Sequence, residues 1–292
     1  MINPGPELQQ LLALLDRRSR LVVLTGAGIS ASSGIPTYRD AGGNWLYSAP
    51  IQHRDFLQEP ATRQRYWTRS WFGWPGVRDA LPNTAHRALA RLEAAGAVEL
   101  LVTQNVDRLH QRAGSSAVVD LHGRLDRVRC VGCGRYSERE EMQLRLEQAN
   151  PHLAALEPGA SSRPDGDMTL PDAMARRTAV PNCLACGGVL MPDVVFFGGT
   201  VPKERVTSVA TAIEAADVLL VVGSSLQVYS GFRFCRAAHA LGKPLVLLNP
   251  GLTRADPLAS LKLFTPCELL LEMLADAVTG VSAQPPLSPP AV

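Results

Sequence analysis

Short apolar runs, each followed by glycine or small polar residues, recur along this chain of 292 residues. Continuous runs rich in Leu and Val are typical of strands that are buried on both faces of a sheet. Helix-like stretches separate them, for example residues 85–95 and 206–215. The runs span residues 21–24, 100–102, 118–121, 218–222 and 245–248. This alternation predicts an α/β protein with a Rossmann-like, doubly wound parallel sheet.

The loops that follow these runs indicate where a ligand binds, because doubly wound sheets bind ligands at the carboxyl ends of their strands. Every one of these loops contains glycine or polar residues. The loops span residues 25–28, 103–107, 122–123, 223–225 and 249–251. We therefore expect all of them to line one binding site.

Two segments interrupt the alternation of strands and helices. Residues 46–80 are rich in aromatic residues and arginine, and residues 126–189 carry two Cys-x-x-Cys pairs around a polar, proline-containing stretch. We expect both segments to form a smaller, partly helical module inserted into a larger Rossmann-like domain. The larger domain is predicted to comprise residues 1–45, 81–125 and 190–275. The proline-rich residues 280–292 are predicted to be a disordered tail.

The charge balance excludes several classes of partner. Lys and Arg number 29 against 27 Asp and Glu, which gives no electrostatic case for binding nucleic acid or a membrane surface. The start of the chain lacks the basic and apolar regions of a signal peptide, and the apolar runs are too short to span a bilayer. We expect a soluble protein of the bacterial cytoplasm, or of the mitochondrial matrix if the chain is eukaryotic.

Four of the six cysteines form two Cys-x-x-Cys pairs, each followed by glycine. In a chain without an export signal, such pairs favour metal over disulfides. Four thiolates complete a tetrahedral zinc site with no open position, so we expect one structural Zn²⁺. Its predicted ligands are Cys130, Cys133, Cys183 and Cys186. A redox pair is the less favoured alternative, and no His or carboxylate supplements the set for catalysis.

The loop after the first run reads Gly26-Ala27-Gly28-Ile29-Ser30-Ala31 and fits the dinucleotide fingerprint G-x-G-x-x-G/A. Its glycines would let backbone N–H groups approach a pyrophosphate at a helix N-terminus. Taken alone, the hexapeptide is equally compatible with a glycine-rich turn before a packing helix. Pro36 should end the helix after about two turns, because proline lacks an N–H donor and restricts the residue before it.

A dehydrogenase is disfavoured. The acidic residue that binds the ribose about 20 residues beyond the fingerprint is missing from residues 44–48, and Pro36 shortens the helix. We therefore expect a bound dinucleotide that is not used for hydride transfer.

Several motifs together resemble the signature of the sirtuin family, in the same order, over roughly residues 10–275. Residues 50–53, 63–67 and 73–75 also resemble its class II branch, which includes mitochondrial and bacterial members. The signature motifs are Gly26-Ala27-Gly28-Ile29-Ser30, Ser33-Gly34-Ile35-Pro36 with Tyr38-Arg39, Thr103-Gln104-Asn105-Val106-Asp107, Leu121-His122-Gly123, Gly223-Ser224-Ser225-Leu226 and Leu248-Asn249.

The resemblance implies an NAD-dependent protein lysine deacylase, which yields lysine, nicotinamide and O-acyl-ADP-ribose. The acyl-lysine carbonyl oxygen would attack the ribose C1′ of NAD and release nicotinamide. His122 would then act as general base toward a ribose hydroxyl, with Asn105 and Asp107 beside it. A His at a strand end suits this role near neutral pH. A lone His is more often structural, but the neighbouring motifs favour catalysis here.

The same resemblance implies which residues bind NAD as co-substrate. Gln104, Asn105 and Asp107 would surround the nicotinamide and its ribose, Arg39 would lie over the cofactor, and Cys267 near the adenine. The expected set is Gly26, Ala27, Gly28, Ser30, Pro36, Tyr38, Arg39, Gln104, Asn105, Val106, Asp107, Gly223, Ser224, Ser225, Asn249, Pro250, Gly251 and Cys267. Turn and helix-cap chemistry is the alternative explanation for these residues.

Three residues depart from the common family pattern. Thr37 replaces an acidic residue, which is expected to weaken contacts in the nicotinamide pocket. Gly199 replaces an acidic residue and Ser230 a proline that robust deacetylases commonly have. Both should flank the peptide groove, in which the substrate peptide would add as a strand between residues 194–198 and the loop after Gly223.

Tyr66 and Arg69 raise the question of the acyl group, because sirtuins that remove acidic acyl groups carry Tyr-x-x-Arg in a comparable place. An arginine fork could bind a substrate carboxylate. The alternative is a helix with its aromatic residues inward and Arg63, Arg65 and Arg69 outward. Both possibilities stay open at this point.

Two other functions also remain. The chain could be a protein mono-ADP-ribosyltransferase that uses the same C1′ electrophile, or a non-catalytic NAD-sensing scaffold. His122, Asn105 and Asp107 argue against the scaffold, since a sensor needs no base. The expected partners are proteins or peptides that bear acyl-lysine, and the oligomeric state stays open.

Overall fold

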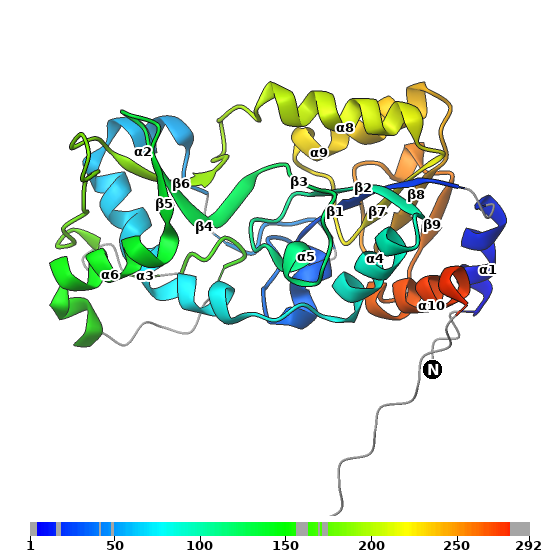
Figure 1. Cartoon of the computed structure of the whole chain (residues 1–292), viewed down its shortest axis with the longest axis horizontal. Coiled ribbons are helices and arrows are strands. Elements are labelled where there is room, and N and C mark those ends of the chain that lie inside the picture. Colours follow the sequence, from blue (N-terminus) through cyan, green and yellow to red (C-terminus); the bar gives the residue numbers. More distant parts are fainter. Residues whose placement is uncertain are drawn as a thin grey trace, which may run out of the picture.

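A computed structural model of the chain describes residues 5–15, 19–40, 42–47, 50–155, 163–168, 170 and 175–280. Its larger sheet has six parallel strands (Figure 1). In spatial order these are β3 (Val118–Asp120), β2 (Val98–Thr103), β1 (Leu21–Thr25), β7 (Val218–Val222), β8 (Leu245–Leu248) and β9 (Leu261–Leu263). From the central strand β1, the chain adds β2 and β3 on one side, and from β7 it adds β8 and β9 on the other. This strand order is that of Rossmann-like folds and confirms the predicted fold class. Strand β9 was not predicted, because a lysine interrupts its short apolar run.

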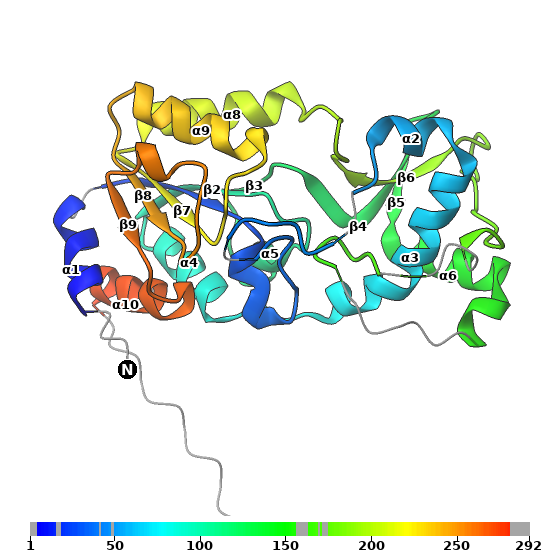
Figure 2. The same cartoon turned by 180° about the vertical axis from the view of Figure 1, so that it is seen from behind.

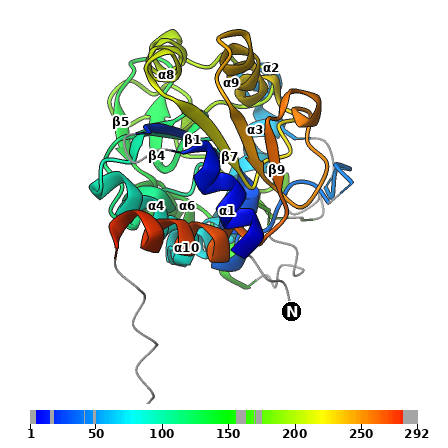
Figure 3. The ribbon, with the colours of Figure 1, turned by 90° about the vertical axis from the view of Figure 1, so that its right-hand side faces the viewer.

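Two helical layers cover the sheet, as Figure 3 shows along its edge. Helices α1 (Gly5–Leu14), α4 (Thr84–Ala94) and α10 (Cys267–Thr279) pack on one face, and α8 (Lys203–Ala215) and α9 (Tyr229–Ala240) on the other. Alternate residues of each strand enter the two cores: Leu21 and Val23 face α4, whereas Val22 and Leu24 face α8. This two-sided burial explains why the strands are continuously apolar.

A smaller antiparallel sheet lies beside the larger one (Figures 1 and 2). Its strands are β5 (Tyr136–Glu138), β4 (Gly123–Cys130) and β6 (Leu190–Val194), in that order. Helices α2 (His53–Gln58), α3 (Pro60–Asp79) and α6 (Arg139–Ala149) pack against it. The core between them includes Phe56, Trp67, Met142 and Met191.

Short helical segments complete the fold: α5 (Leu109–Arg112) and the 3₁₀ helices η1 (Ala27–Ser33), η2 (Pro151–Ala155) and η3 (Asp256–Leu258). The helix expected after the glycine fingerprint is η1, and it ends before Pro36 at Gly34, which has a left-handed φ of 85°. Strand β6 and the start of β4 fall in ranges assigned to the larger domain, so the domain division stays a prediction.

Two further expectations concern a disordered tail and membrane-spanning segments. Of the tail predicted at residues 280–292, only Gly280 lies within the described residues. Among the helices that the structure describes, none is long and apolar enough to cross a membrane.

Candidate functional site

A cavity of about 1090 Å³ lies at the carboxyl ends of β1, β2, β7 and β8 and reaches the smaller sheet at Val194. His122 lines it together with most residues expected to bind NAD. Those lining residues are Gly26, Ala27, Gly28, Tyr38, Arg39, Gln104, Asn105, Val106, Gly223, Ser224, Ser225, Asn249, Pro250, Gly251 and Cys267. The loops predicted to meet at one sheet edge therefore do so. Ser30, Pro36 and Asp107 do not line the cavity wall.

The glycine loop after β1 lies directly against the loop after β7. The Gly26 N–H donates to the Val222 carbonyl oxygen at 3.1 Å, and the Gly28 N–H donates to that of Gly223 at 2.8 Å. A Cβ atom at Gly28 would come within 2.8 Å of the Gly223 oxygen. Glycine is therefore required for this close approach, which leaves backbone at the surface of the cavity.

Ser30 and Asp107 form a buried layer behind the cavity wall. The Ser30 hydroxyl donates to Asp107 Oδ2 at 2.8 Å, and Asn105 Nδ2 donates to Ser30 Oγ at 3.1 Å. Asp107 Oδ1 accepts a hydrogen bond from the Leu109 N–H at 2.9 Å. Burial raises the pKa of the Asp107 carboxyl, while these hydrogen bonds oppose the rise. The network fixes the Asn105 side chain at the cavity surface.

His122 is held at both ring nitrogens. Its Nδ1 lies 2.9 Å from the Gln104 carbonyl oxygen, and its Nε2 lies 2.6 Å from Ser230 Oγ. A carbonyl oxygen can only accept, so Nδ1 carries the hydrogen and Nε2 has the lone pair in the neutral ring. Burial, together with Arg205 and Arg233, lowers the pKa of His122 to about 4, while the hydrogen bond to the Gln104 carbonyl oxygen opposes the fall. The imidazole is therefore neutral near pH 7 and can accept a proton at Nε2.

Gln104 connects this histidine to the ends of β1 and β7. Its side-chain Nε2 donates to Ser224 Oγ at 2.8 Å and to the Thr25 carbonyl oxygen at 3.2 Å. A Cβ atom at Gly231 would come within 2.5 Å of Gln104 Oε1, so the first turn of α9 packs closely on this side chain.

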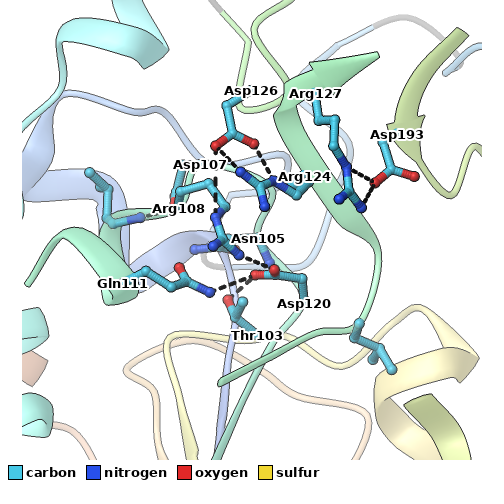
Figure 4. Close-up of polar contacts among 12 residues, drawn as sticks. Thr103, Asn105, Asp107, Arg108, Gln111, Asp120, Arg124, Asp126, Arg127 and Asp193 are labelled. Carbon is cyan, nitrogen blue, oxygen red and sulfur yellow. Dashed lines mark hydrogen bonds and ion pairs between the residues drawn. The ribbon is translucent and has the colours of Figure 1, made fainter. Parts of the chain in front are cut away.

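Several ion pairs lie between the loop of residues 104–107 and the smaller sheet (Figure 4). Arg108 is paired with Asp120, whose other carboxyl oxygen accepts from Gln111 at 2.9 Å. Farther along β4, Arg124 Nη2 donates to Asp126 at 2.6 Å. Arg127 Nε donates to Asp193 of β6 at 2.9 Å.

The segment of Thr37, Tyr38 and Arg39 forms part of the cavity rim. Arg39 donates to the Gly43 carbonyl oxygen at 2.7 Å, and its guanidinium lies 4.0 Å from the centre of the Trp45 ring. The Thr37 hydroxyl donates to the Arg39 carbonyl oxygen at 2.9 Å. Thr37 therefore uses its hydroxyl within the loop itself.

Tyr66 and Arg69 occupy different environments. Tyr66 lines the cavity, whereas Arg69 does not. Arg69 is only 8% exposed and its Nε lies 2.7 Å from Asp167 Oδ1. Asp165 also lines the cavity, and burial raises the pKa of its carboxyl group. The alternative prediction, a helix whose arginines point outward, is therefore wrong for Arg69. The Arg69 guanidinium is buried and forms an ion pair with Asp167.

The expected peptide groove runs along the segment after β6. Residues 194–199 line the cavity, and the Val195 N–H donates to the His122 carbonyl oxygen at 2.8 Å. Gly199 lies against His53, with a Cβ atom there 3.5 Å from the His53 side chain. Ser230 also lines the cavity, but its hydroxyl is directed at His122.

The four paired cysteines converge in the smaller sheet region. Their Sγ atoms all lie within 4.8 Å of one another, with Cys130 to Cys186 at 3.5 Å and Cys133 to Cys183 at 3.8 Å. A tetrahedral zinc with Zn–S bonds of about 2.3 Å separates its sulfur atoms by about 3.8 Å. The cluster therefore fits one structural zinc and brings the two knuckles together as predicted.

Sequence reasoning missed the residues that close the cavity on the far side of β8. Phe264, Thr265 and Pro266 line it directly after β9, and Tyr229 and Arg233 line it from α9. The signal that could have found the first group is the short run Leu261–Leu263, which is followed by Phe264, Thr265 and Pro266. No comparable pattern marks the α9 residues.

Comparisons with known proteins agree with this architecture. The Sir2 family model matches residues 26–230. A protein of Xanthomonas campestris pv. campestris named "NAD-dependent protein deacetylase" is 55% identical over 270 residues, which is 92% of this chain and 90% of that protein. A Bos taurus protein named "NAD-dependent protein lipoamidase sirtuin-4, mitochondrial" is 47% identical over 94% of this chain and 89% of its own length.

A solved structure described as "Sir2-p53 peptide-NAD+" superimposes with a TM-score of 0.74 at 31% identity, covering 94% of this chain and 99% of that one. The family model matches most of the chain, curated relatives are similar over nearly its whole length, and a solved structure superimposes on it. This chain therefore belongs to the Sir2 family, the sirtuins.

Proposed function

We propose that this protein is an NAD-dependent protein lysine deacylase, with His122 as the general base. The observation that carries the proposal is the state of His122, whose neutral ring keeps its lone pair on Nε2, beside Ser230, and which lines the same cavity as Gly26 and Gly28. Relatives more than half identical are named NAD-dependent protein deacetylases, which supports the same reaction here. Asn105 would act beside His122 at the cavity surface, and Asp107 would support Asn105 from behind through Ser30.

The lining residues fit a dinucleotide. The glycine loop offers backbone close to β7, and Ser224 and Asn249 add polar groups at the adjoining strand ends. Bound NAD would supply the electrophilic ribose C1′ with nicotinamide as leaving group. Asn105, fixed by Ser30, would orient amide or hydroxyl groups, and His122 would take up a proton at Nε2. Cys267 would lie at the adenine end, where burial raises the pKa of its thiol to about 12.

We propose acyl-lysine peptides as substrates, bound along residues 194–198. The solved relative with a bound p53 peptide and NAD supports this class of partner. For the acyl chain, the structure favours neutral groups over acidic ones. Arg69 is paired with Asp167 and does not line the cavity, whereas Asp165 does. A carboxylate on the substrate would therefore lie near Asp165 and would gain no unpaired guanidinium from Arg69.

The proposal also covers the division into domains and the cellular location. We propose residues 1–45, 81–125 and 190–275 as the NAD-binding domain and residues 46–80 and 126–189 as the zinc module. A cytoplasmic location is proposed because relatives that are 52–55% identical to this chain are bacterial.

The test is nicotinamide release from NAD with acetyl-lysine and succinyl-lysine peptides, in wild type and His122→Ala. Release that needs the acetyl peptide and disappears in the variant supports deacylation. Release without peptide, with label appearing on protein, would indicate ADP-ribosyl transfer instead. Tight NAD binding without any release would favour the sensing scaffold. A preference for succinyl-lysine that Arg69→Ala abolishes would overturn the proposed neutral acyl chain.

A further inference from the structure

His122 and Ser230 lie 108 positions apart in the chain and meet at the cavity. His122 follows β3, and Ser230 lies in the first turn of α9. Their contact, 2.6 Å from Nε2 to Oγ, is the shortest hydrogen bond that the His122 ring makes among the described residues. Proline, which robust deacetylases commonly have at this position, could not form it because its side chain has no donor or acceptor.

The direction of each hydrogen bond follows from its partner. The Gln104 carbonyl oxygen accepts from Nδ1, which leaves the lone pair of the neutral ring on Nε2. The Ser230 hydroxyl must therefore donate to Nε2. Two partners on opposite sides of the ring fix both its tautomer and its orientation.

The same hydroxyl can serve the protonated ring. When His122 carries a proton on Nε2, the Ser230 oxygen can accept from it, because a hydroxyl has one donor and two acceptor positions. A hydrogen bond from a charged donor is roughly twice as strong as one between neutral groups. Ser230 therefore stabilises the protonated histidine more than the neutral one.

The surroundings of His122 otherwise oppose a positive charge. Burial removes water from the imidazole, and the charged groups that face it are Arg205 of α8 and Arg233 of α9. Besides Ser230, only the Gln104 carbonyl oxygen favours the protonated form among the described residues. A base in this position needs a partner that stabilises the proton it has accepted.

We propose that Ser230 is a positioning residue for His122, fixing the imidazole ring and stabilising the proton that this ring accepts. The inference rests on the proposed role of His122 as general base and adds a residue from α9 to that role.

The first test uses the full chain without NAD, so that its readout is independent of turnover. Protonation of His122 is followed by NMR of ¹⁵N-labelled histidine, with the signal assigned by its loss in His122→Ala. We expect Ser230→Ala to weaken proton binding to His122 roughly five- to tenfold. Ser230→Thr should restore most of it, because it keeps the hydroxyl. Ser208→Ala removes a hydroxyl from an exposed position of α8 and is the matched control.

The second test separates the steps of the reaction in the presence of NAD and an acetyl-lysine peptide. Exchange of labelled nicotinamide into NAD reports the step before His122 acts, and O-acetyl-ADP-ribose reports the steps after it. We expect Ser230→Ala to retain exchange within about twofold and to slow product formation roughly tenfold, with rescue by Ser230→Thr.

An unchanged protonation of His122 in Ser230→Ala would overturn the inference, as would equal loss of exchange and product formation. If wild type shows no peptide-dependent release of nicotinamide, the proposed function fails instead. The NMR comparison would still decide whether Ser230 acts on His122.

Discussion

Arg108 and Asp120 form an ion pair that ties the loop of residues 104–107 to the strand before His122 (Figure 4). Arg108 follows Asp107 directly, and Asp120 stands two positions before His122. Arg108 has a left-handed φ of 66°, which costs a non-glycine residue about 1 kcal/mol or more. The ion pair, together with Gln111, offsets this cost and holds two parts of the site in register.

Replacing Arg108 with Gln should therefore destabilise the protein and weaken catalysis. Asp120 is mostly buried and would lose its cation, so we expect a loss of about 1–3 kcal/mol in urea unfolding. Deacetylation should fall more than NAD affinity, because His122 loses its alignment with residues 104–107. Arg20→Gln, which breaks an exposed pair with Glu99, is the control and should change stability by less than about 1 kcal/mol. Equal stability of the two variants would contradict the assigned role.

Gly223 is a position in the cavity wall where a single methyl group should be strongly disruptive. It has a φ of 59°, and a Cβ atom would come within 2.5 Å of the Ile29 nitrogen. Gly223→Ala should lower stability by several kcal/mol and weaken NAD binding, because it separates the loops after β1 and β7. Gly76→Ala in α3 meets nothing within 4 Å and should be neutral or stabilising by up to about 1 kcal/mol. Thermal unfolding and an NAD titration check both variants.

Buried histidines should make the fold sensitive to acid. His86 and His110 lie with ring centres 4.8 Å apart, and burial lowers the pKa of His86 to about 4 and that of His110 well below its usual value. The unfolded chain binds protons near pH 6.5 while the folded chain does not, so stability falls as pH drops from about 6.5 toward 4.

The measurement is urea unfolding at pH 7.5 and pH 5, in wild type and His86→Gln. We expect the variant to lose less stability on acidification, by an amount on the order of 1–2 kcal/mol. His239→Gln changes an exposed histidine and should behave as wild type. The same acid response in wild type and His86→Gln would rule out His86 as a source of the sensitivity.

Removing one zinc ligand should unfold the smaller sheet region. Cys183→Ser breaks the four-thiolate set, and we expect the metal content to fall from one zinc per chain to near zero. Leu184→Ala, at an 82% exposed position of the same knuckle, should keep the metal. Elemental analysis and circular dichroism distinguish these outcomes. Full zinc retention in Cys183→Ser would mean that the cluster does not bind as four ligands.

The sequence by itself determined the parallel sheet, the glycine loop and the paired cysteines. These are encoded locally: two-sided burial makes each strand apolar along its length, close backbone approach requires glycine at position 28, and metal knuckles need Cys at a fixed spacing. His122 also followed from local sequence, because it stands at a strand end between recognisable neighbours. Strand β9 was not predicted from the sequence, because Lys262 interrupts its apolar run.

Only the tertiary structure decided which side chains serve as partners. Ser230 is hydrogen-bonded to His122, 108 positions away in the chain, and Asp167 forms an ion pair with Arg69, 98 positions away. Sequence spacing predicts the direction of a side chain within one helix or strand. It does not predict the distance between side chains on different helices and strands. The packing of α9 and α3 against the sheets fixes those distances, and with them the hydrogen bond of Ser230 to His122 and the ion pair of Arg69 with Asp167.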